Sequence, residues 1–369
     1  MKGYAKPLNE FICGQQIQFV IPVYQRNYDW LQDNCDQLLS DLVKLIHSGR
    51  TSHFFGSIVT SVAGTGFSRL VIDGQQRLTT ISLLLLAGIK AVNDGLLEIS
   101  NESRKDEAYD LFLNAKYCNS ERKIKLVPIE NDRIAYDKIF NGEDELDENS
   151  KITRNFRHFY DKLTRKPQQL TFDNLLDAVE HLQIISIELD ADDDAQLIFE
   201  SLNSTGLALT EADKIRNYLL MSLTAEEQQL CFKNYWQKIE SASENNPTKF
   251  LRDYLTIKQQ LQRPVRLSNI YFEWKKYMDG RDRKQEMLEM LDYARYYQQV
   301  TEAQMETSKL SAKMRHICNI ESDVTNVFFI QFLKYAATNN LSYDEIDKVI
   351  DVVENYLARR IICNMPGNA

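Results

Sequence analysis

The segment Asp73–Arg77 holds the residues best suited to chemistry and reads Asp-Gly-Gln-Gln-Arg. The apolar run 70–72 before it predicts a buried strand, and the long apolar stretch after it predicts a buried helix of about five turns. A strand that enters a helix through a glycine turn suits anion binding, because unpaired backbone N–H groups and the helix dipole act at the same point. Arg77 adds a guanidinium whose fork geometry suits phosphate.

The same residues also have a purely structural explanation. Asp73 is a good N-cap residue, and Gln76 three positions later would complete a pair that resembles a capping box. A capped helix can still present Gln75 and Arg77 to a ligand, so the two interpretations are compatible and both stay open.

A second polar segment, Tyr24-Gln25-Arg26, follows the strand predicted at 17–21. Aromatic faces next to Arg and Gln can stack on a base and bind a phosphate or sugar. The aromatic residues Tyr28 and Trp30 could instead pack at the start of the next helix. We favour packing for Trp30 and a binding role for Gln25 and Arg26.

A third segment, 199–219, predicts a helix, an Asn-Ser-Thr-Gly turn at 203–206 that caps it, and a second helix. Thr210 and Asp213 have capping-box spacing, which gives Asp213 a structural explanation. The acidic run Asp192–Asp194 could hold a metal ion, but three carboxylates before a helix more often stabilise its N-terminus.

The composition limits the classes of protein. A chain of 369 residues with 43% hydrophobic residues can bury a large core. The net charge of −9 argues against wrapping nucleic acid over the whole surface, but it allows a local basic groove. There is no apolar run long enough to span a membrane, no signal-peptide pattern and no zinc-type cysteine spacing. We expect a cytoplasmic protein with reduced thiols and no membrane partner.

The hydrophobic patterns predict an α+β fold. Strands are expected at 17–21, 54–62, 68–72, 123–129 and 182–189, and Gly56 indicates a bulge or a close backbone approach. Helices are expected between them, including a surface helix at 101–116. No strand is expected beyond residue 219, so we expect a first domain at 1–222 and an all-helical domain at 223–369. Its predicted helices are 226–241, 248–261, 283–300, 312–317, 324–337 and 343–362.

The three polar segments together resemble a known family. The sequences IPVYQRNYDW (21–30), DGQQRLTT (73–80) and FESLNSTGLALTEADKIRNYL (199–219), in this order and separation, are similar to the N-terminal domain family of GmrSD-type modification-dependent restriction enzymes. That family has a small mixed sheet of the ParB/sulfiredoxin type. The resemblance covers roughly residues 10 to 222 and implies the same core for this chain.

The resemblance implies a nucleotide-binding site that handles NTP phosphates and supports their hydrolysis. In the mechanism we expect, Arg77 and Arg26 hold phosphates, and Asp73, Gln75 or Gln76 orients a water molecule. Mg²⁺ is expected with the nucleotide, and no metal-binding residues are assigned. The candidate catalytic residues are Asp73, Gln75, Gln76 and Arg77; the candidate nucleotide-binding residues are Tyr24, Gln25, Arg26, Gly74, Thr79, Asn203 and Asp213.

The family role implied is defence against phage or foreign DNA, in which NTP binding controls cleavage by a nuclease part. The five histidines show no HNH-like pairing. We therefore expect the nuclease to be a further domain or a partner subunit, and this chain alone not to cut DNA. The predicted function is an NTP-binding and NTP-hydrolysing sensor module of a modification-dependent restriction or phage-defence system, with DNA as a further partner.

Two other functions stay open. The first is a ParB-like DNA-binding or DNA-nicking domain that uses the same Arg26 and Arg77. The second is an interaction scaffold made by the helical half. The sequence does not decide which NTP is bound, which DNA modification is sensed, or whether the chain forms a homodimer.

Overall fold

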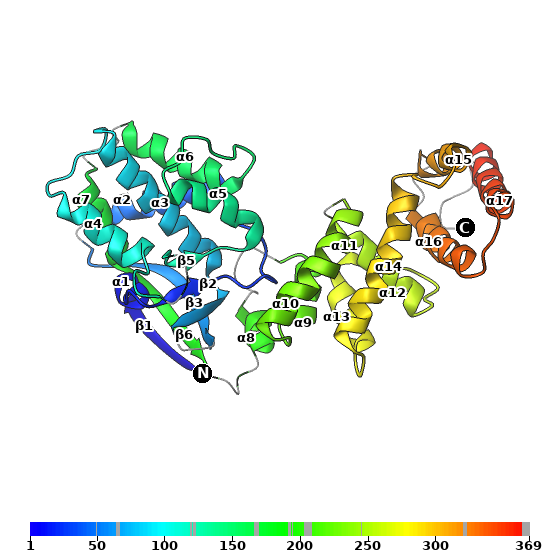
Figure 1. Cartoon of the computed structure of the whole chain (residues 1–369), viewed down its shortest axis with the longest axis horizontal. Coiled ribbons are helices and arrows are strands. Elements are labelled where there is room, and N and C mark those ends of the chain that lie inside the picture. The colour runs from blue at the N-terminus through cyan, green and yellow to red at the C-terminus, as the bar shows by residue number, and fades with distance from the viewer. Residues whose placement is uncertain are drawn as a thin grey trace. The chain divides into compact units, whose positions relative to one another are not determined.

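The chain forms two compact units, Met1–Ala208 and Leu209–Ala369. The first contains a mixed sheet with helices, and the described part of the second contains only helices (Figure 1). The predicted α+β class with a helical C-terminal region is therefore confirmed. The computed structural model describes residues 1–48, 50–63, 67–118, 120, 123–165, 170–190, 193, 195–202, 209–244, 246–319 and 323–363.

The sheet of the first unit has six strands in the order β1-β6-β3-β4-β2-β5. Strand β3 pairs in parallel with β6 and antiparallel with β4, and β2 pairs in parallel with both β4 and β5. The strands are β1 Lys2–Pro7, β2 Gln18–Val20, β3 His53–Ala63, β4 Ser68–Asp73, β5 Leu126–Val127 and β6 Leu182–Leu189.

Strand β1 and the short helix after it, α1 (Leu8–Ile12), were not predicted. Strand β1 lies at the sheet edge, where Lys2 to Pro7 pair antiparallel with Glu188 to Gln183. Its first four residues are exposed, so the sequence Lys-Gly-Tyr-Ala shows no buried alternation. The strand is held by backbone pairing to β6, a long-range interaction that a local pattern does not reveal.

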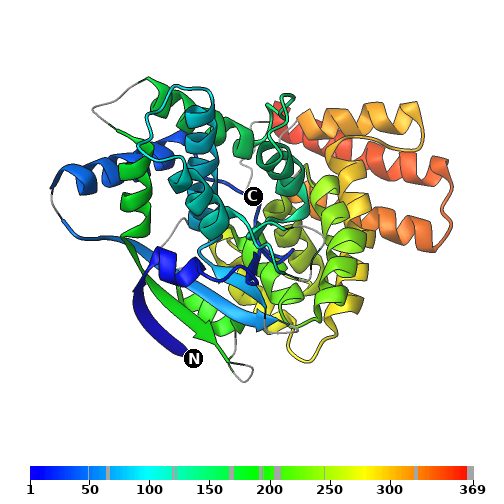
Figure 2. The same cartoon turned by 60° about the vertical axis from the view of Figure 1, so that its left-hand side comes forward.

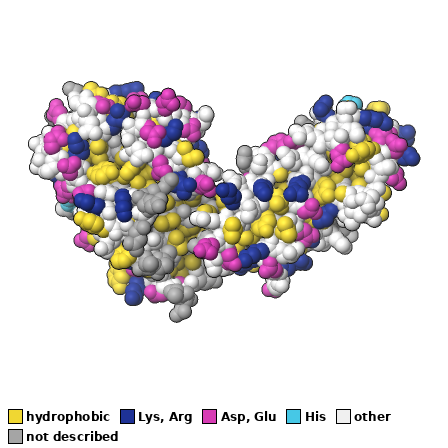
Figure 3. Space-filling view, in the orientation of Figure 1, with side chains coloured by type: hydrophobic (Ala, Val, Ile, Leu, Met, Phe, Trp, Pro, Cys, Tyr) yellow, Lys and Arg dark blue, Asp and Glu magenta, His cyan; other side chains and the backbone are white. Residues whose placement is uncertain are grey.

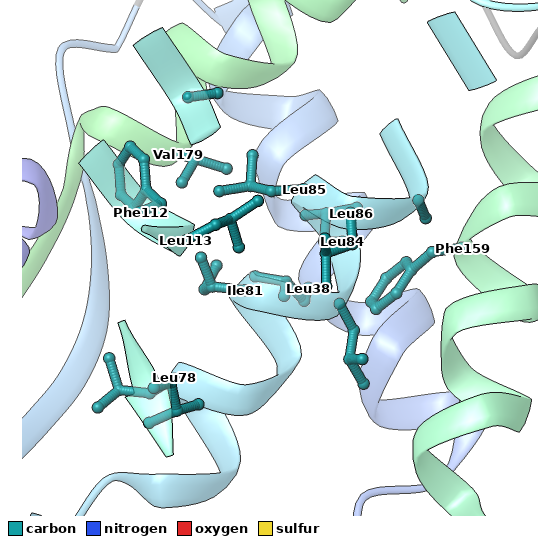
Figure 4. Packing of buried hydrophobic residues seen from close by; sticks show 14 of the residues in the cluster. Leu38, Leu78, Ile81, Leu84, Leu85, Leu86, Phe112, Leu113, Phe159 and Val179 are labelled. Atoms are coloured by element: carbon teal, nitrogen blue, oxygen red, sulfur yellow. The ribbon is translucent and has the colours of Figure 1, made fainter. Parts of the chain in front are cut away.

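Helix α3 (Gln75–Asn93) is the centre of the first unit and is buried on nearly every side, as predicted. It packs against α6 and α7, and its Ile81, Leu84 and Leu85 lie in one apolar cluster with Leu38 and Phe159 (Figure 4). The helices from α2 to α7 lie on one side of the sheet (Figure 2). Their bounds are α2 Gln32–Ser48, α4 Ser103–Ala108, α5 Glu130–Phe140, α6 Lys151–Thr164 and α7 Phe172–Glu180, with α8 Ala195–Leu202 after β6.

The helix predicted at 101–116 is shorter than expected and lies only partly at the surface. Helix α4 is short and continues as a π-helical turn, Tyr109–Leu113, in which Phe112 and Leu113 are buried in the core. Its charged first half explains the prediction of a surface helix, because only that half faces solvent.

The second unit contains the helices predicted for the C-terminal half, but the π-helical turn Phe232–Trp236 divides the one predicted at 226–241 into α10 and α11. Helix α13 was not predicted, because its apolar residues are large aromatic side chains in a short helix, and Trp274 among them is fully buried. Helix α9, which the sequence pattern grouped with the first domain, lies in the second unit. The helices are α9 Glu211–Leu220, α10 Ala225–Cys231, α11 Gln237–Ala242, α12 Pro247–Lys258, α13 Ile270–Tyr277, α14 Arg283–Thr301, α15 Ser308–Asn319, α16 Asp323–Thr338 and α17 Tyr343–Ile362.

Within the described ranges, none of the helices combines the length and the apolar character that crossing a bilayer requires.

Candidate functional site

The turn between β4 and α3 is made by Gly74, which has a φ of 97° in the left-handed region. A Cβ atom at this position would lie 3.0 Å from a side-chain carbon of Ile58, so the turn needs glycine for both conformation and space. The predicted N-cap role of Asp73 is wrong. Gly74 occupies the N-cap position, and no side chain caps the helix.

The amide of Gln76 joins the loop 24–30 to the start of α3. Its Oε1 accepts hydrogen bonds from the backbone N–H of Asp29 at 2.8 Å and of Trp30 at 3.3 Å, and its Nε2 donates to the Asn27 carbonyl at 3.2 Å. The predicted capping pair with Asp73 is therefore not formed. Gln76 is 9% exposed, and its amide is occupied in holding two sequence motifs together.

Two further glutamines connect the same segments. Gln25 donates from Nε2 to the Ile72 carbonyl at 2.8 Å, and Gln75 donates from Nε2 to the Arg26 carbonyl at 3.3 Å. Both side chains are buried. The Oε1 atom of Gln75 is buried and has no hydrogen-bond partner in the structure. This buried acceptor lies at the first position of α3.

A chain of hydrogen bonds behind this contact fixes the loop. Asn155 donates to the Tyr28 hydroxyl at 3.0 Å, that hydroxyl pairs with Thr80 Oγ1 at 2.8 Å, and Thr80 donates to the Gln76 carbonyl at 2.7 Å. Asn155 was not predicted. The available signal was an asparagine between Ile152 and Phe156 on a helix with a strongly apolar face.

Acidic groups lie beside the loop. The Tyr28 N–H donates to Asp132 Oδ2 at 2.6 Å, and burial raises the pKa of Asp132 to about 6. Nearby Asp29 raises that pKa further, whereas the Tyr28 N–H and Lys151 lower it. Asp29 itself pairs with Lys151 and lies 3.7 Å from Arg26 Nη1. Asp132 and Lys151 were not among the predicted site residues.

Arg77 is held against β3. Its Nη2 donates to Asp73 Oδ2 at 3.0 Å and to the Ser57 carbonyl at 2.5 Å, and its side chain lies over Gly56. The pairing of β3 with β6 shifts register between Phe54 and Gly56, which confirms the predicted irregularity at Gly56. The guanidinium is thus fixed in place, and the side chain stays 23% exposed.

The other predicted residues have different surroundings. Tyr24 and Thr79 are each 2% exposed, and burial raises the pKa of Tyr24. Asp213 lies in the second unit, where it closes the predicted capping box with Thr210 and pairs with Arg216 at 2.7 Å. Asn203, Asp192 and Asp194, and the turn 203–206, fall outside the described residues.

The charges of the site are balanced. Arg77 pairs with Asp73 and Arg26 lies near Asp29, so each cation already has a carboxylate neighbour. The first N–H groups of α3 have no acceptor within their own helix, which makes this helix end favourable for an anion. No three His, Cys, Asp or Glu side chains of the described ranges gather as a metal site would require.

A comparison with known protein families identifies the chain. Residues 8–220 match the family described as "GmrSD restriction endonuclease, N-terminal domain", and this range contains all three polar segments. No curated protein matches the chain. The match covers more than half of the sequence, so the chain belongs to the GmrSD restriction endonuclease N-terminal domain family, which connects it with a restriction system.

Proposed function

We propose that this chain is the NTP-binding and NTP-hydrolysing regulatory module of a restriction system. The observation that carries the proposal is the direct contact between the Tyr24–Arg26 segment and the Asp73–Arg77 segment. The loop 24–30 is bound through glutamine amides to the first turn of α3, beside an arginine that is fixed on β3. The site thus brings together backbone donors, a guanidinium and polar side chains at one helix end.

The phosphates of the nucleotide would bind at the N-terminus of α3. The N–H groups of the first turn and the helix dipole favour an anion there, as in other glycine-turn sites. Asp73 and the Ser57 carbonyl hold Arg77 before any ligand arrives, so little side-chain entropy is lost when it binds phosphate. Arg26 supplies a second cation from the loop.

Gln75 is better placed than Gln76 to orient a water molecule. The Gln76 amide is engaged at both ends by backbone groups, whereas the Gln75 Oε1 acceptor is buried without a partner. Leaving such an acceptor unsatisfied costs about 1–3 kcal/mol, so a donor is expected to meet it in the working protein. A water molecule or a nucleotide hydroxyl is such a donor.

The residues present fit a nucleotide-bound Mg²⁺. This ion usually takes one or two carboxylates, keeps several waters, and binds the substrate phosphates. Asp73 is the carboxylate at the β4–α3 turn and would hold it. When bound, Mg²⁺ would add to the positive charge that Arg77 and Arg26 bring to the phosphates, because each of these arginines already has a carboxylate neighbour, Asp73 or Asp29.

The chain belongs to a restriction endonuclease family, which suggests that nucleotide binding regulates the cleavage of DNA. We propose that the nucleotide state of this module controls DNA cleavage by a nuclease domain or partner subunit, with DNA as the second ligand. The alternative is a ParB-like DNA-binding or DNA-nicking domain that needs no nucleotide.

Ligand-induced stabilisation separates these two functions. The purified chain is melted with ATP, GTP, CTP or UTP, each with and without Mg²⁺. At about one hundred times the Kd, one bound nucleotide stabilises the native state by about 2.7 kcal/mol, which raises Tm clearly. We expect this rise for at least one NTP. The proposal would be refuted if no NTP raised Tm and the chain bound DNA without nucleotide.

A further inference from the structure

The charges of the chain are unevenly distributed. Residues 1–208 contain 22 Lys and Arg against 31 Asp and Glu, whereas residues 209–369 contain 22 of each. Acidic and basic side chains are interspersed over the visible face of the first unit (Figure 3). Within the second unit, the stretch 263–284 has seven Lys and Arg against three Asp and Glu. The stretch 263–284 is therefore positively charged, although the protein as a whole has a net negative charge.

Helix α13 lies in the middle of this positive stretch and has two distinct faces. Ile270, Trp274 and Tyr277 are buried, and the Trp274 ring lies 6.2 Å from that of Tyr254. The opposite face presents Phe272, Lys275 and Lys276 to solvent. The aromatic packing fixes the helix, so its exposed face is a rigid platform.

Cations also flank α13 at both ends. Arg263 and Arg266 precede it, are exposed, and have no side-chain partner among the described residues. Arg281 and Lys284 follow it and are exposed as well, and Lys284 pairs with Glu227. An α-helix with its side chains is about 10–12 Å in diameter, which is close to the width of the major groove of B-DNA.

Aromatic rings keep several of these cations at the surface. Lys276 Nζ lies 4.1 Å from the Phe272 ring centroid, and the Arg281 guanidinium lies 4.2 Å from that of Tyr277. Phe272 is 61% exposed. Lys276 also pairs with Glu273 at 3.1 Å, so the arginines before α13 carry the least compensated charge of the stretch.

We infer that α13 and its flanking segments, residues 263–284, form a surface that binds the sugar–phosphate backbone of duplex DNA. The helix would lie along a groove, and the flanking cations would contact phosphates on its two sides. The inference rests on the proposed function in that DNA is taken as the partner. It places DNA on the second unit, separate from Arg26 and Arg77.

The test compares two full-length variants with equal loss of charge. The first replaces Arg263, Arg266, Lys275 and Lys276 with Gln. The control replaces Lys233, Lys238, Arg295 and Arg315 with Gln as well; these four are also exposed cations of the second unit. Binding of a labelled duplex of about two helical turns is measured by anisotropy at several salt concentrations without nucleotide, with polyglutamate as a second probe. A double variant, Arg263→Gln with Arg266→Gln, changes no helix residue and guards against misfolding.

We expect the first variant to bind DNA at least about tenfold more weakly than wild type. Its slope of log affinity against log salt should fall by about 3 to 4, close to one for each lost phosphate contact. In the double variant the slope should fall by about half as much, and in the control variant it should stay close to that of wild type. Equal losses in both fourfold variants, or an equal loss of polyglutamate binding, would overturn the inference. Nucleotide titration of the same variant should match wild type, so a failure of nucleotide binding is recognised separately.

Discussion

The side chain of Arg77 lies across Gly56, so close that a Cβ atom at residue 56 would be 3.3 Å from Cζ and Nε of the guanidinium. Gly56 also has a φ of 116°, which side-chain-bearing residues rarely adopt. The irregularity in β3 therefore makes room for the arginine of the candidate phosphate site. Because Gly56 has no side chain, Arg77 of α3 can pack directly against the backbone of β3.

We expect Gly56→Ala to lower both stability and nucleotide affinity. The strained backbone costs about 1–3 kcal/mol, and the added methyl group would displace the Arg77 guanidinium. The control is Gly142→Ala, because Gly142 also has a positive φ, 70°, but no atom lies within 4 Å of its added Cβ. Urea unfolding should show a loss in both variants, and nucleotide titration a loss only in Gly56→Ala. Wild-type affinity of Gly56→Ala would contradict this role for Gly56.

Replacing Gln76 with Ala should release the loop 24–30. The change leaves two N–H groups and one carbonyl without partners, and we expect the free energy of unfolding to fall by about 2–4 kcal/mol. Hydrogen exchange should show faster exchange at the N–H groups of Asp29 and Trp30. Gln37→Ala removes an exposed hydrogen bond to Asp41 and should change little. Unchanged protection of Asp29 and Trp30 would exclude the role assigned to Gln76.

The variant Gln75→Leu should separate binding from stability. Gln75→Leu loses the 3.3 Å hydrogen bond to the Arg26 carbonyl, but it also removes a buried acceptor that has no partner. These two effects offset each other, so the free energy of unfolding should change by less than about 1 kcal/mol. Nucleotide affinity should nevertheless fall about tenfold if the acceptor meets the ligand or its water. Gln18→Leu is the matched control, because Gln18 is buried and donates to the Ile124 carbonyl at 2.8 Å. Gln18→Leu should lose stability and keep its nucleotide affinity. A Gln75→Leu variant that loses stability but binds nucleotide like wild type would refute the role of Gln75.

The pKa of Asp132 leads to a pH-dependent expectation. The value in the folded protein, about 6, lies above the ordinary 3.8, so its contribution to stability is complete below about pH 4 and is lost as the pH rises through 6. Asp132→Asn cannot ionise. Its stability relative to wild type should therefore rise by about 2 kcal/mol between about pH 4 and pH 7.

Urea unfolding at several pH values measures this difference. Asp144→Asn, in an exposed acidic loop, serves as the control and should show no comparable trend. A stability difference for Asp132→Asn that stays constant across this pH range would show that Asp132 is not buried as the structure describes.

The elements that bury a regular apolar face could be predicted from the sequence. Strand β6 and helix α17 begin and end at the predicted residues, because each alternates or repeats apolar residues along its length. Strand β1 could not, since its backbone pairs with β6 while its side chains face solvent. Helix α13 was missed because the packing of Trp274 against Tyr254 and Tyr277, a tertiary feature, determines its position.

The site could be predicted only in part. The adjacency of the Tyr24–Arg26 and Asp73–Arg77 segments followed from the family resemblance, and the structure places them in direct contact. The role of Gln76 could not be predicted, because its amide binds Asp29, which is 47 positions away in the chain. Spacing left a capping role for Asp73 open, whereas the left-handed Gly74 occupies that position.

The central claim is that the N-terminus of α3 and Arg77 bind nucleotide phosphates, and calorimetric titration of Arg77→Ala tests it most directly. A charge-assisted contact to phosphate is worth about 1.5–3 kcal/mol, so we expect a loss of about tenfold or more in NTP affinity in a folded variant. Arg50→Ala, which removes an exposed arginine next to β3, should bind like wild type. If folded Arg77→Ala binds the nucleotide as tightly as Arg50→Ala does, the phosphate site is not at this helix end.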